Sequence, residues 1–132
     1  MLYLLDTNIC IYGRIRRPEI LARFALLTIG EAGMSVVTYG ELAYGCTKSS
    51  DPQLALARLS RFLDFIPAVP LPLSAGTIYG RIRRDLELRG ERIGPNDLWV
   101  ASHAMASDLI LVTNNEREFR RIPGLKIENW AK

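Results

Sequence analysis

Short apolar runs alternate with longer stretches of helical periodicity along the chain. Runs that are apolar at nearly every position indicate buried strands, whereas apolar residues three or four positions apart indicate helices. The predicted strands are Leu2–Leu5, Met34–Val37, Phe65–Val69 and Leu109–Val112, with Leu125–Ile127 as a short fifth. The predicted helices are Pro18–Leu27, Thr38–Thr47, Pro52–Leu63, Ser74–Arg89, Asn96–Ser107 and a short Glu116–Arg120. This alternation predicts an α/β protein with a parallel sheet covered on both faces and right-handed crossovers.

Acidic residues follow three of these predicted strands. The first strand ends LLDTN, which places Asp6 at its carboxyl end, and the second ends SVVTYGE, which places Glu41 in the first turn of the next helix. The fourth ends LVTNNERE, with Glu116 and Glu118, and Asp97 opens the helix GPNDLWVASHA that leads into it. Open parallel sheets bind ligands beyond the carboxyl ends of their strands, so we expect these acids to converge there.

Each acid also has a purely structural explanation. Asp6 could serve as an N-cap, Thr38-x-x-Glu41 fits a capping box, and Asp97 could satisfy the start of its helix. Together, however, three acids at one sheet edge would repel one another unless a cation neutralised them. Oxygen ligands without a Cys or His partner favour Mg²⁺ or Mn²⁺ over zinc.

Length and composition narrow the class of protein. A chain of 132 residues predicts one domain, residues 1–132, and a composition of 48% hydrophobic and 23% charged residues is that of a globular protein. No apolar run reaches the roughly 20 residues that cross a bilayer, and the start MLYLLDTN has no basic leader. We therefore expect no membrane partner. Cys10 and Cys46 are isolated, which favours a reducing, cytoplasmic setting.

The chain is mildly basic, with a net charge of +3 and a pI of about 9.1. This balance is a weak indication of a polyanionic partner, and arginine suits bidentate contact with phosphate. Solvated helix faces explain arginine clusters equally well. The two clusters are Arg14, Arg16 and Arg17, and Arg81, Arg83 and Arg84.

His103 is the only histidine, which leaves no zinc constellation and no supported Ser-His-Asp triad. It lies six residues after Asp97, about 240° around an ideal helix, so we expect a packing or surface residue that points away from that carboxylate. No glycine cluster matches a P-loop or a dinucleotide-binding fingerprint.

The ordered set LLDTNICIY, SVVTYGELAYG, IGPNDLWVASHA and LVTNNEREF, closing with IPGLKIENW, resembles the VapC toxins of the PIN-domain ribonucleases. The resemblance runs almost from Met1 to Trp130, and it implies a three-layer α/β/α sandwich around a parallel sheet. Asp6, Glu41 and Asp97 coincide with the three invariant acids of the family.

The activity that the resemblance implies is that of a Mg²⁺- or Mn²⁺-dependent endoribonuclease, the toxic half of a type II toxin–antitoxin pair. Such toxins form homodimers and are inhibited by a VapB-type antitoxin, whose C-terminal segment lies over the active-site groove. The antitoxin also carries the DNA-binding domain, so the toxin would contact DNA only through the antitoxin. Toxin and antitoxin together would form an assembly larger than the toxin dimer. The RNA is commonly structured, and often a tRNA.

Residue roles follow from this resemblance and from the chemistry. Asp6 and Asp97 are the expected metal ligands, with Glu41 either a further ligand or the residue that orients the attacking water. In-line attack on phosphorus would leave a 5′-phosphate and a 3′-hydroxyl. Residues expected to position water or phosphate are Thr7, Asn8 and Thr113, and the candidate phosphate-binding arginines are Arg84, Arg92 and Arg117.

One position departs from the family pattern. Many PIN domains carry an aspartate where this chain has Asn115, which puts the fourth acidic ligand in question. We expect Glu118 to replace it, acting on a second metal ion or through water, with Asn115 as a hydrogen-bonding neighbour and Glu116 pointing away. The spacing Asn115-x-x-Glu118 also fits a capping box, so Glu118 could instead be a capping residue.

Three other functions fit this sequence less well. A receiver domain would need an acidic pair after the first strand and a Lys-Pro near the last, and this chain has the single Asp6 and Ile122-Pro123. An aspartyl phosphatase would need D-x-D where the chain reads Asp6-Thr7-Asn8. A non-catalytic PIN scaffold would not need the three acids that this sequence retains.

Overall fold

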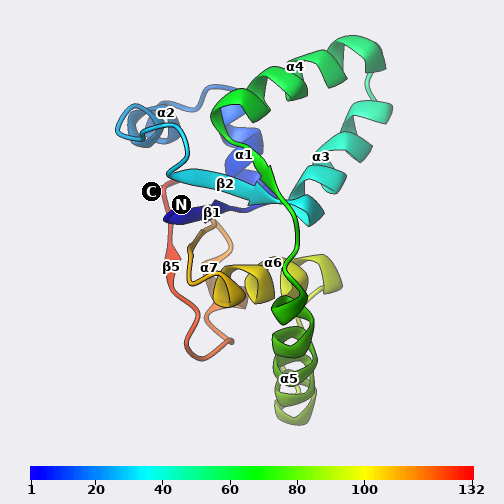
Figure 1. The fold of residues 1–132 in the computed structure, drawn as a ribbon, viewed down its shortest axis with the longest axis vertical. Helices are drawn as coiled ribbons and strands as arrows, with labels where there is room; N and C mark the ends of the chain where they lie inside the picture. Colours follow the sequence, from blue (N-terminus) through cyan, green and yellow to red (C-terminus); the bar gives the residue numbers. More distant parts are fainter.

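Five parallel strands form the central sheet in a computed structural model that describes residues 1–132 (Figure 1). The strands lie in the spatial order β3-β2-β1-β4-β5, so the first strand is central and the chain builds outward on both sides of it. The strands are β1 Tyr3–Leu5, β2 Ala32–Ser35, β3 Ala68–Val69, β4 Ile110–Val112 and β5 Ile127–Glu128.

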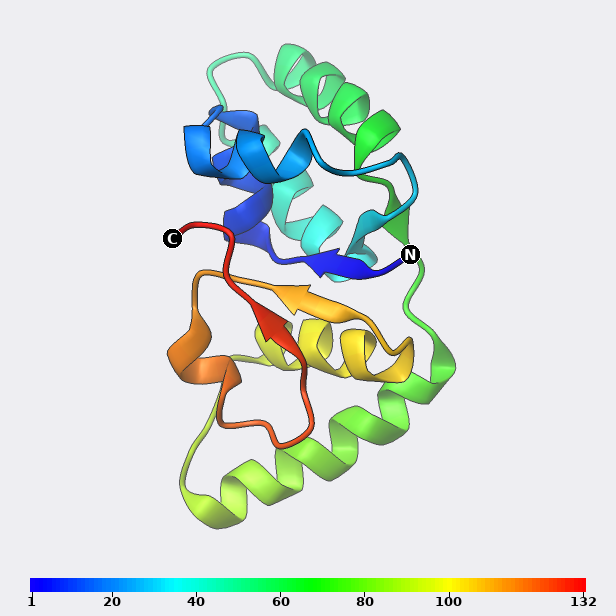
Figure 2. The same cartoon turned by 90° about the vertical axis from the view of Figure 1, so that its left-hand side faces the viewer.

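The helices lie in two groups on opposite sides of the sheet, as Figure 2 shows, with α1 to α4 above the strands and α5 to α7 below them. This arrangement is the predicted three-layer α/β/α sandwich. The helices are α1 Thr7–Arg14, α2 Pro18–Phe24, α3 Val36–Thr47, α4 Pro52–Phe65, α5 Leu73–Arg89, α6 Pro95–Ala106 and α7 Glu116–Phe119.

Each side of the sheet has its own hydrophobic core, and β1 contributes to both. Successive residues of a strand point to opposite faces. Leu5 packs with Ile9 and other residues of α1 to α4, whereas Leu4 packs with Leu98 and other residues of α5 to α7. Both leucines are fully buried, which explains why the first strand is apolar at every position.

The second predicted strand, Met34–Val37, is too long at its carboxyl end. The strand stops at Ser35, whose hydroxyl oxygen accepts a hydrogen bond from the Val37 backbone N–H at 3.2 Å and caps α3. Val36 and Val37 therefore begin the helix, although β-branched residues favour strands.

Other predicted boundaries also change. The third strand is only Ala68–Val69 instead of Phe65–Val69, because α4 continues to Phe65. The fifth shifts from Leu125–Ile127 to Ile127–Glu128, and α2 ends at Phe24 instead of Leu27. The helix Thr7–Arg14 was absent from the predicted helices, although an N-cap role for Asp6 already required one there. No helix combines the length and apolar character that crossing a bilayer requires.

Candidate active site

Asp6 lies where β1 passes into α1, and both of its carboxylate oxygens are engaged. Oδ1 accepts a hydrogen bond from the Ile9 backbone N–H at 3.0 Å, and Oδ2 accepts one from the hydroxyl of Thr113 at the end of β4. The N-cap explanation is thus confirmed for one oxygen, while the other faces the neighbouring strand. Asp6 is only 6% exposed, and this burial raises the pKa of its carboxyl group.

Glu41 belongs to the second turn of α3, not to the first, because the helix begins at Val36. Its Oε1 accepts a hydrogen bond from the Thr7 hydroxyl at 3.1 Å, which ties α3 to the start of α1. The capping-box explanation is wrong, since Ser35 is the cap and the buried Thr38 hydroxyl has no hydrogen-bond partner. Glu41 is therefore held at the carboxyl edge of the sheet by Thr7.

Asp97 stands in the first turn of α6, half-buried, and no side chain caps this helix. Its pKa is raised to about 6, first by burial and then by the negative charges of Glu118, Asp6 and Glu41. The structure therefore brings the four predicted acids within electrostatic reach of one another, although they come from four different elements.

Glu118 reaches this group from α7. Its Oε2 accepts a hydrogen bond from the Asn115 side-chain amide at 2.5 Å, which makes Asn115 the expected neighbour. The alternative capping box is wrong, because the side chain of Asn115 caps no helical N–H and its backbone N–H donates to the Thr113 hydroxyl at 2.9 Å. Glu116 points elsewhere, toward Asn129 at 2.9 Å and Lys132 at 2.7 Å.

No basic side chain balances these four carboxyl groups. The ion pairs of the molecule use other acids, such as Glu19, Glu87 and Glu116. The donor set is all oxygen and carries uncompensated negative charge, which suits a hard divalent cation. As they stand, no three Asp, Glu, His or Cys side chains form a closed metal-binding group. Repulsion between carboxylates acts over longer distances than metal coordination. The raised pKa of Asp97 and the lack of a ready-made ligand group therefore agree if a bound cation would draw the carboxylates closer together.

Two threonine hydroxyls donate hydrogen bonds to acids of the site. Thr7 and Thr113 were expected to position water or phosphate, and in the structure their hydroxyls hold Glu41 and Asp6. Asn8 is exposed, and its side chain makes no hydrogen bond. These pairings join residues far apart in the sequence, and no local pattern indicates them.

The candidate phosphate-binding arginines are not gathered at the acids. Arg84 and Arg117 are exposed on α5 and α7, and Arg92 lines a cavity of about 330 Å³ between α5 and α6. Sequence reasoning missed Arg14 as a neighbour of the site. This residue lines a smaller groove of about 200 Å³ together with Thr7 and Glu41.

His103 is a residue of α6 and is fully buried against the start of α3, as expected for a packing residue. Its Nδ1 lies 2.9 Å from the Ser35 hydroxyl oxygen, and its Nε2 has no partner. Burial lowers the pKa of His103, so the neutral imidazole is favoured. Because Ser35 accepts from Val37, its own hydrogen is free to donate to Nδ1, and the pair links α3 to α6.

The chain is similar to known proteins over almost its whole length. A family model described as the PIN domain matches residues 3–125. The chain is 40% identical over 139 residues to ribonuclease VapC2 of Rickettsia felis, with 100% of both chains covered. It is also 40% identical over 129 residues to the tRNA(fMet)-specific endonuclease VapC of Shigella flexneri, with 98% of both chains covered.

Solved structures agree with these sequence matches. The structure of VapBC2 from Rickettsia felis bound to a DNA fragment from its promoter includes a chain with a TM-score of 0.91 and 38% identity. That alignment covers 98% of this chain and 99% of the other. VapBC-1 from nontypeable Haemophilus influenzae gives a TM-score of 0.93 and 34% identity, with both chains covered completely.

Proposed function

Because the chain belongs to the VapC ribonucleases of the PIN-domain family, we propose that it is a metal-dependent endoribonuclease toxin. The observation that carries this proposal is the gathering of Asp6, Glu41, Asp97 and Glu118 at the carboxyl edge of the sheet without a basic partner. Such a group binds a divalent cation and, through it, an RNA phosphate that would otherwise be repelled.

Mg²⁺ or Mn²⁺ is the proposed cofactor, since carboxylate oxygens are the only ligands on offer. Asp6 and Asp97 would hold the ion, with Glu41 as a ligand or an orienting residue and Glu118 in the place of the aspartate that is absent at Asn115. A cation bound there would make water more acidic and offset charge on the phosphate in the transition state.

The residues of this chain prepare the site for hydrolysis of a phosphodiester. Ile9 and Thr113 donate to Asp6 and favour its ionised form, which opposes the effect of burial on the pKa. Thr7 occupies only one oxygen of Glu41, so the other is free to accept a hydrogen bond from the attacking water. In-line attack would leave a 5′-phosphate and a 3′-hydroxyl, and it needs no 2′-hydroxyl nucleophile and no histidine.

The proposed partners follow from the relatives. Similar solved structures are VapBC assemblies, so we expect a VapB-type antitoxin to inhibit this chain and to mediate any contact with DNA. A tRNA is the expected substrate, since a relative is a tRNA(fMet)-specific endonuclease. We place the contact of the proposed homodimer on α5, where Leu73 and Leu88 are 95% and 70% exposed. The cytoplasm is the proposed compartment, where Cys10 and Cys46 would remain free thiols.

Cleavage by purified protein tests the proposal. The chain should cut total tRNA in the presence of Mg²⁺ or Mn²⁺, and chelation should stop the reaction. Asp6→Asn should lose at least about a hundredfold in rate, because a metal ligand is removed while an asparagine still caps α1. Equal cleavage by both proteins would refute the metal site.

Activity in cells gives an independent test. Expression without an antitoxin should arrest growth, and Asp97→Ala should relieve the arrest. If Asp97→Ala arrested growth as strongly as the parent chain, the toxicity would not depend on this site. Sequencing the 5′ ends of RNAs cut in the arrested cells would identify the substrate and the cleaved bond.

A further inference from the structure

A groove of about 600 Å³ between α1 and α4 is lined by four arginines. We call this the arginine groove; the residues that define it here are Arg14, Arg16, Arg58, Arg61, Phe62 and Phe65. Arg14 and Arg16 come from the end of α1 and the residues after it, and the other four come from α4. No acidic side chain lines the groove.

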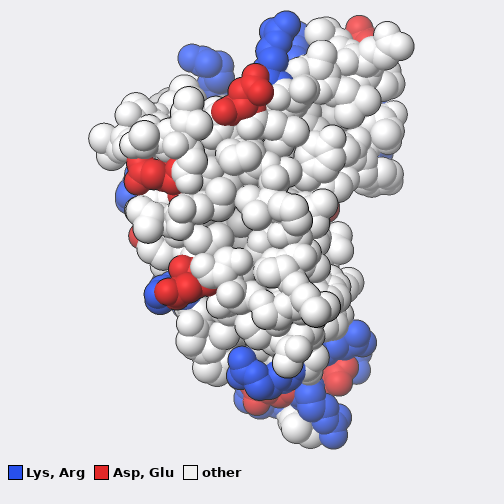
Figure 3. Space-filling model, viewed as in Figure 1, with Lys and Arg blue, Asp and Glu red and all other residues white.

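The four guanidinium groups have no partner within the molecule. None of them forms an ion pair or a hydrogen bond, whereas Arg83, Arg89 and Arg120 are all paired with nearby carboxylates. Figure 3 shows basic side chains at the two ends of one face, over α4 and over α5, with acidic side chains beside them at both ends. The charge of the arginine groove is therefore available to an external anion.

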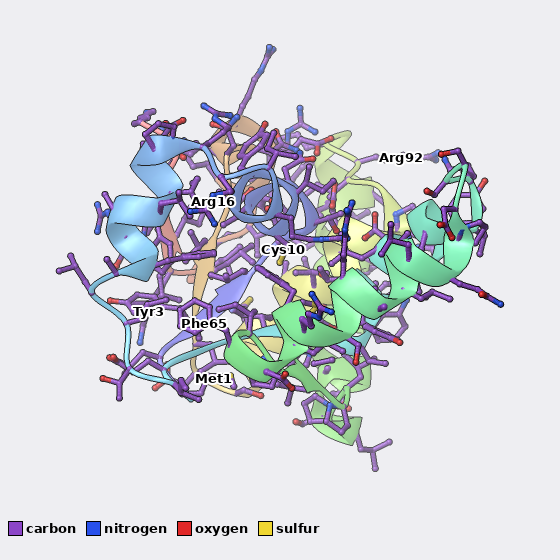
Figure 4. The ribbon with its side chains drawn as sticks, turned by 90° about the horizontal axis from the view of Figure 1, so that it is seen from above. Met1, Tyr3, Cys10, Arg16, Phe65 and Arg92 are labelled. Carbon is purple, nitrogen blue, oxygen red and sulfur yellow. The ribbon has the colours of Figure 1, made fainter.

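This groove continues into the candidate active site. Ile11 and Arg14 line both the arginine groove and the smaller groove that contains Thr7 and Glu41. Figure 4 shows Arg16 on the side of α1 and α2, well apart from Arg92 on the loop after α5. An RNA chain that extends from the four acids past Arg14 would therefore run along α4, away from Arg92.

Arg16 keeps a large side chain where the backbone favours glycine. Its φ is +63°, in the left-handed region, directly after the last turn of α1. Helices commonly end with a glycine in this conformation, because other residues are strained there. The arginine at this position places a basic side chain in the groove at a cost in backbone strain.

We propose that the arginine groove binds a single-stranded segment of the RNA substrate next to the bond that is cut. Arginines would contact successive phosphates, and the partly buried rings of Phe62 and Phe65 would support unstacked bases. The inference rests on the proposed ribonuclease function, whose acids the groove adjoins. An acidic protein segment is the competing occupant, and continuity with the catalytic groove favours the RNA.

Binding measured without cleavage tests this inference. The probe is a fluorescein-labelled oligouridylate of about 16 nucleotides, titrated with the full chain in the presence of a chelator. The logarithm of the affinity should fall linearly with the logarithm of the salt concentration. Arg58→Gln/Arg61→Gln should reduce that slope by about 0.7 for each arginine removed and weaken binding roughly tenfold or more at low salt.

A matched control removes the same charge elsewhere. The double variant Arg81→Gln/Arg83→Gln lies on the exposed surface of α5, outside the arginine groove, and should leave the slope unchanged. Equal effects of both double variants, or no effect of either, would overturn the inference. Unchanged RNA binding together with weaker inhibition by the VapB-type antitoxin would assign the groove to the antitoxin instead.

Arg16→Gly separates binding from folding. Glycine relieves the left-handed strain, so the melting temperature should be no lower than that of the parent chain, while RNA binding should weaken. Unchanged RNA binding by this stable variant would exclude Arg16 from the contact. Failure of the groove is distinguishable from failure of the proposed function, because Asp6→Asn abolishes cleavage without removing the groove arginines.

Discussion

Thr113 donates its hydroxyl hydrogen to the carboxylate of Asp6, although the two residues are 107 positions apart in the sequence. The bond joins the ends of the neighbouring strands β1 and β4, which pair in parallel with Leu5 opposite Val112. Thr113 is fully buried, so its hydroxyl hydrogen would lack an acceptor without Asp6. The strand pairing thus fixes the position of the most buried acid of the site.

Thr113→Val should test this contact. The change keeps the shape of the side chain but removes two hydrogen bonds, the one donated to Asp6 and the one accepted from the Asn115 backbone N–H. The free energy of unfolding should therefore fall by about 1–2 kcal/mol. Urea denaturation would measure the loss. Thr113→Ser keeps the hydroxyl, so it should retain the stability that these hydrogen bonds provide. It should also retain the cleavage activity. If valine and serine behaved alike, the hydrogen bond would have no role in holding Asp6.

Asp97→Asn should stabilise the metal-free protein at neutral pH and abolish cleavage. Burial and neighbouring carboxylates raise the pKa of Asp97 to about 6, so its ionised form is unfavourable in the folded state. Because this group is half-buried, the free energy of unfolding should rise by only about 1 kcal/mol, which corresponds to roughly 3 °C in melting temperature. The unfolded chain has the ordinary, lower pKa, so the gain should shrink below about pH 6 and vanish near pH 4.

Thermal melts of parent and Asp97→Asn across this pH range, with a chelator present, would show the trend. Added Mg²⁺ should then raise the melting temperature of the parent more than that of the variant, because a ligand that binds only the folded state stabilises it. A pH-independent difference between the two proteins would contradict the electrostatic explanation.

Glu118→Gln should decide whether the site has three acids or four. If Glu118 replaces the missing aspartate, the affinity for Mn²⁺ should fall about tenfold and cleavage should slow. Calorimetric titration with Mn²⁺ would measure the affinity. Glu116→Gln is the matched control, because Glu116 pairs with Arg120 and Lys132 instead of facing the other acids. Unchanged binding and cleavage in Glu118→Gln would leave Asp6, Glu41 and Asp97 as the complete set.

His103 should make the protein sensitive to mild acid. Burial lowers its pKa below the ordinary value of 6.5, so the unfolded chain binds the proton more readily than the folded one. The contribution of His103 to stability should therefore diminish as the pH falls below about 6.5. In the variant His103→Gln, the fall in melting temperature across this range should be smaller than in the parent. An equal fall in both proteins would show that other groups cause it.

The fold was largely predictable because its strands are buried on both faces. Leu4 and Leu5 serve two different cores, and such continuous apolar runs are typical of a parallel sheet. Boundaries were less predictable where local preferences compete. Val36 and Val37 favour a strand, but the hydroxyl of Ser35 caps the following helix and includes both valines in it.

The acids of the site were predictable from their places at strand ends, whereas their supports were not. Asp6 and Glu41 follow the first two strands in the sequence, so the topology rules bring them together. Nothing near either residue in the sequence indicates Thr113 or Thr7 as its partner, since these contacts form only when the strands pair and α1 packs on α3. The same reason explains why Arg14 was missed as a neighbour of Glu41.

The four acids are divided between the two hydrophobic cores. Asp6 and Glu41 adjoin Ile9 and Leu42 in the core of α1 to α4, whereas Asp97 and Glu118 adjoin residues in the core of α5 to α7. A divalent ion bound by both pairs would add a second link between the two cores, which β1 already joins. Amide hydrogen exchange should then slow in both α1 and α6 when the ion binds, so that cofactor loading would increase the cooperativity of the fold.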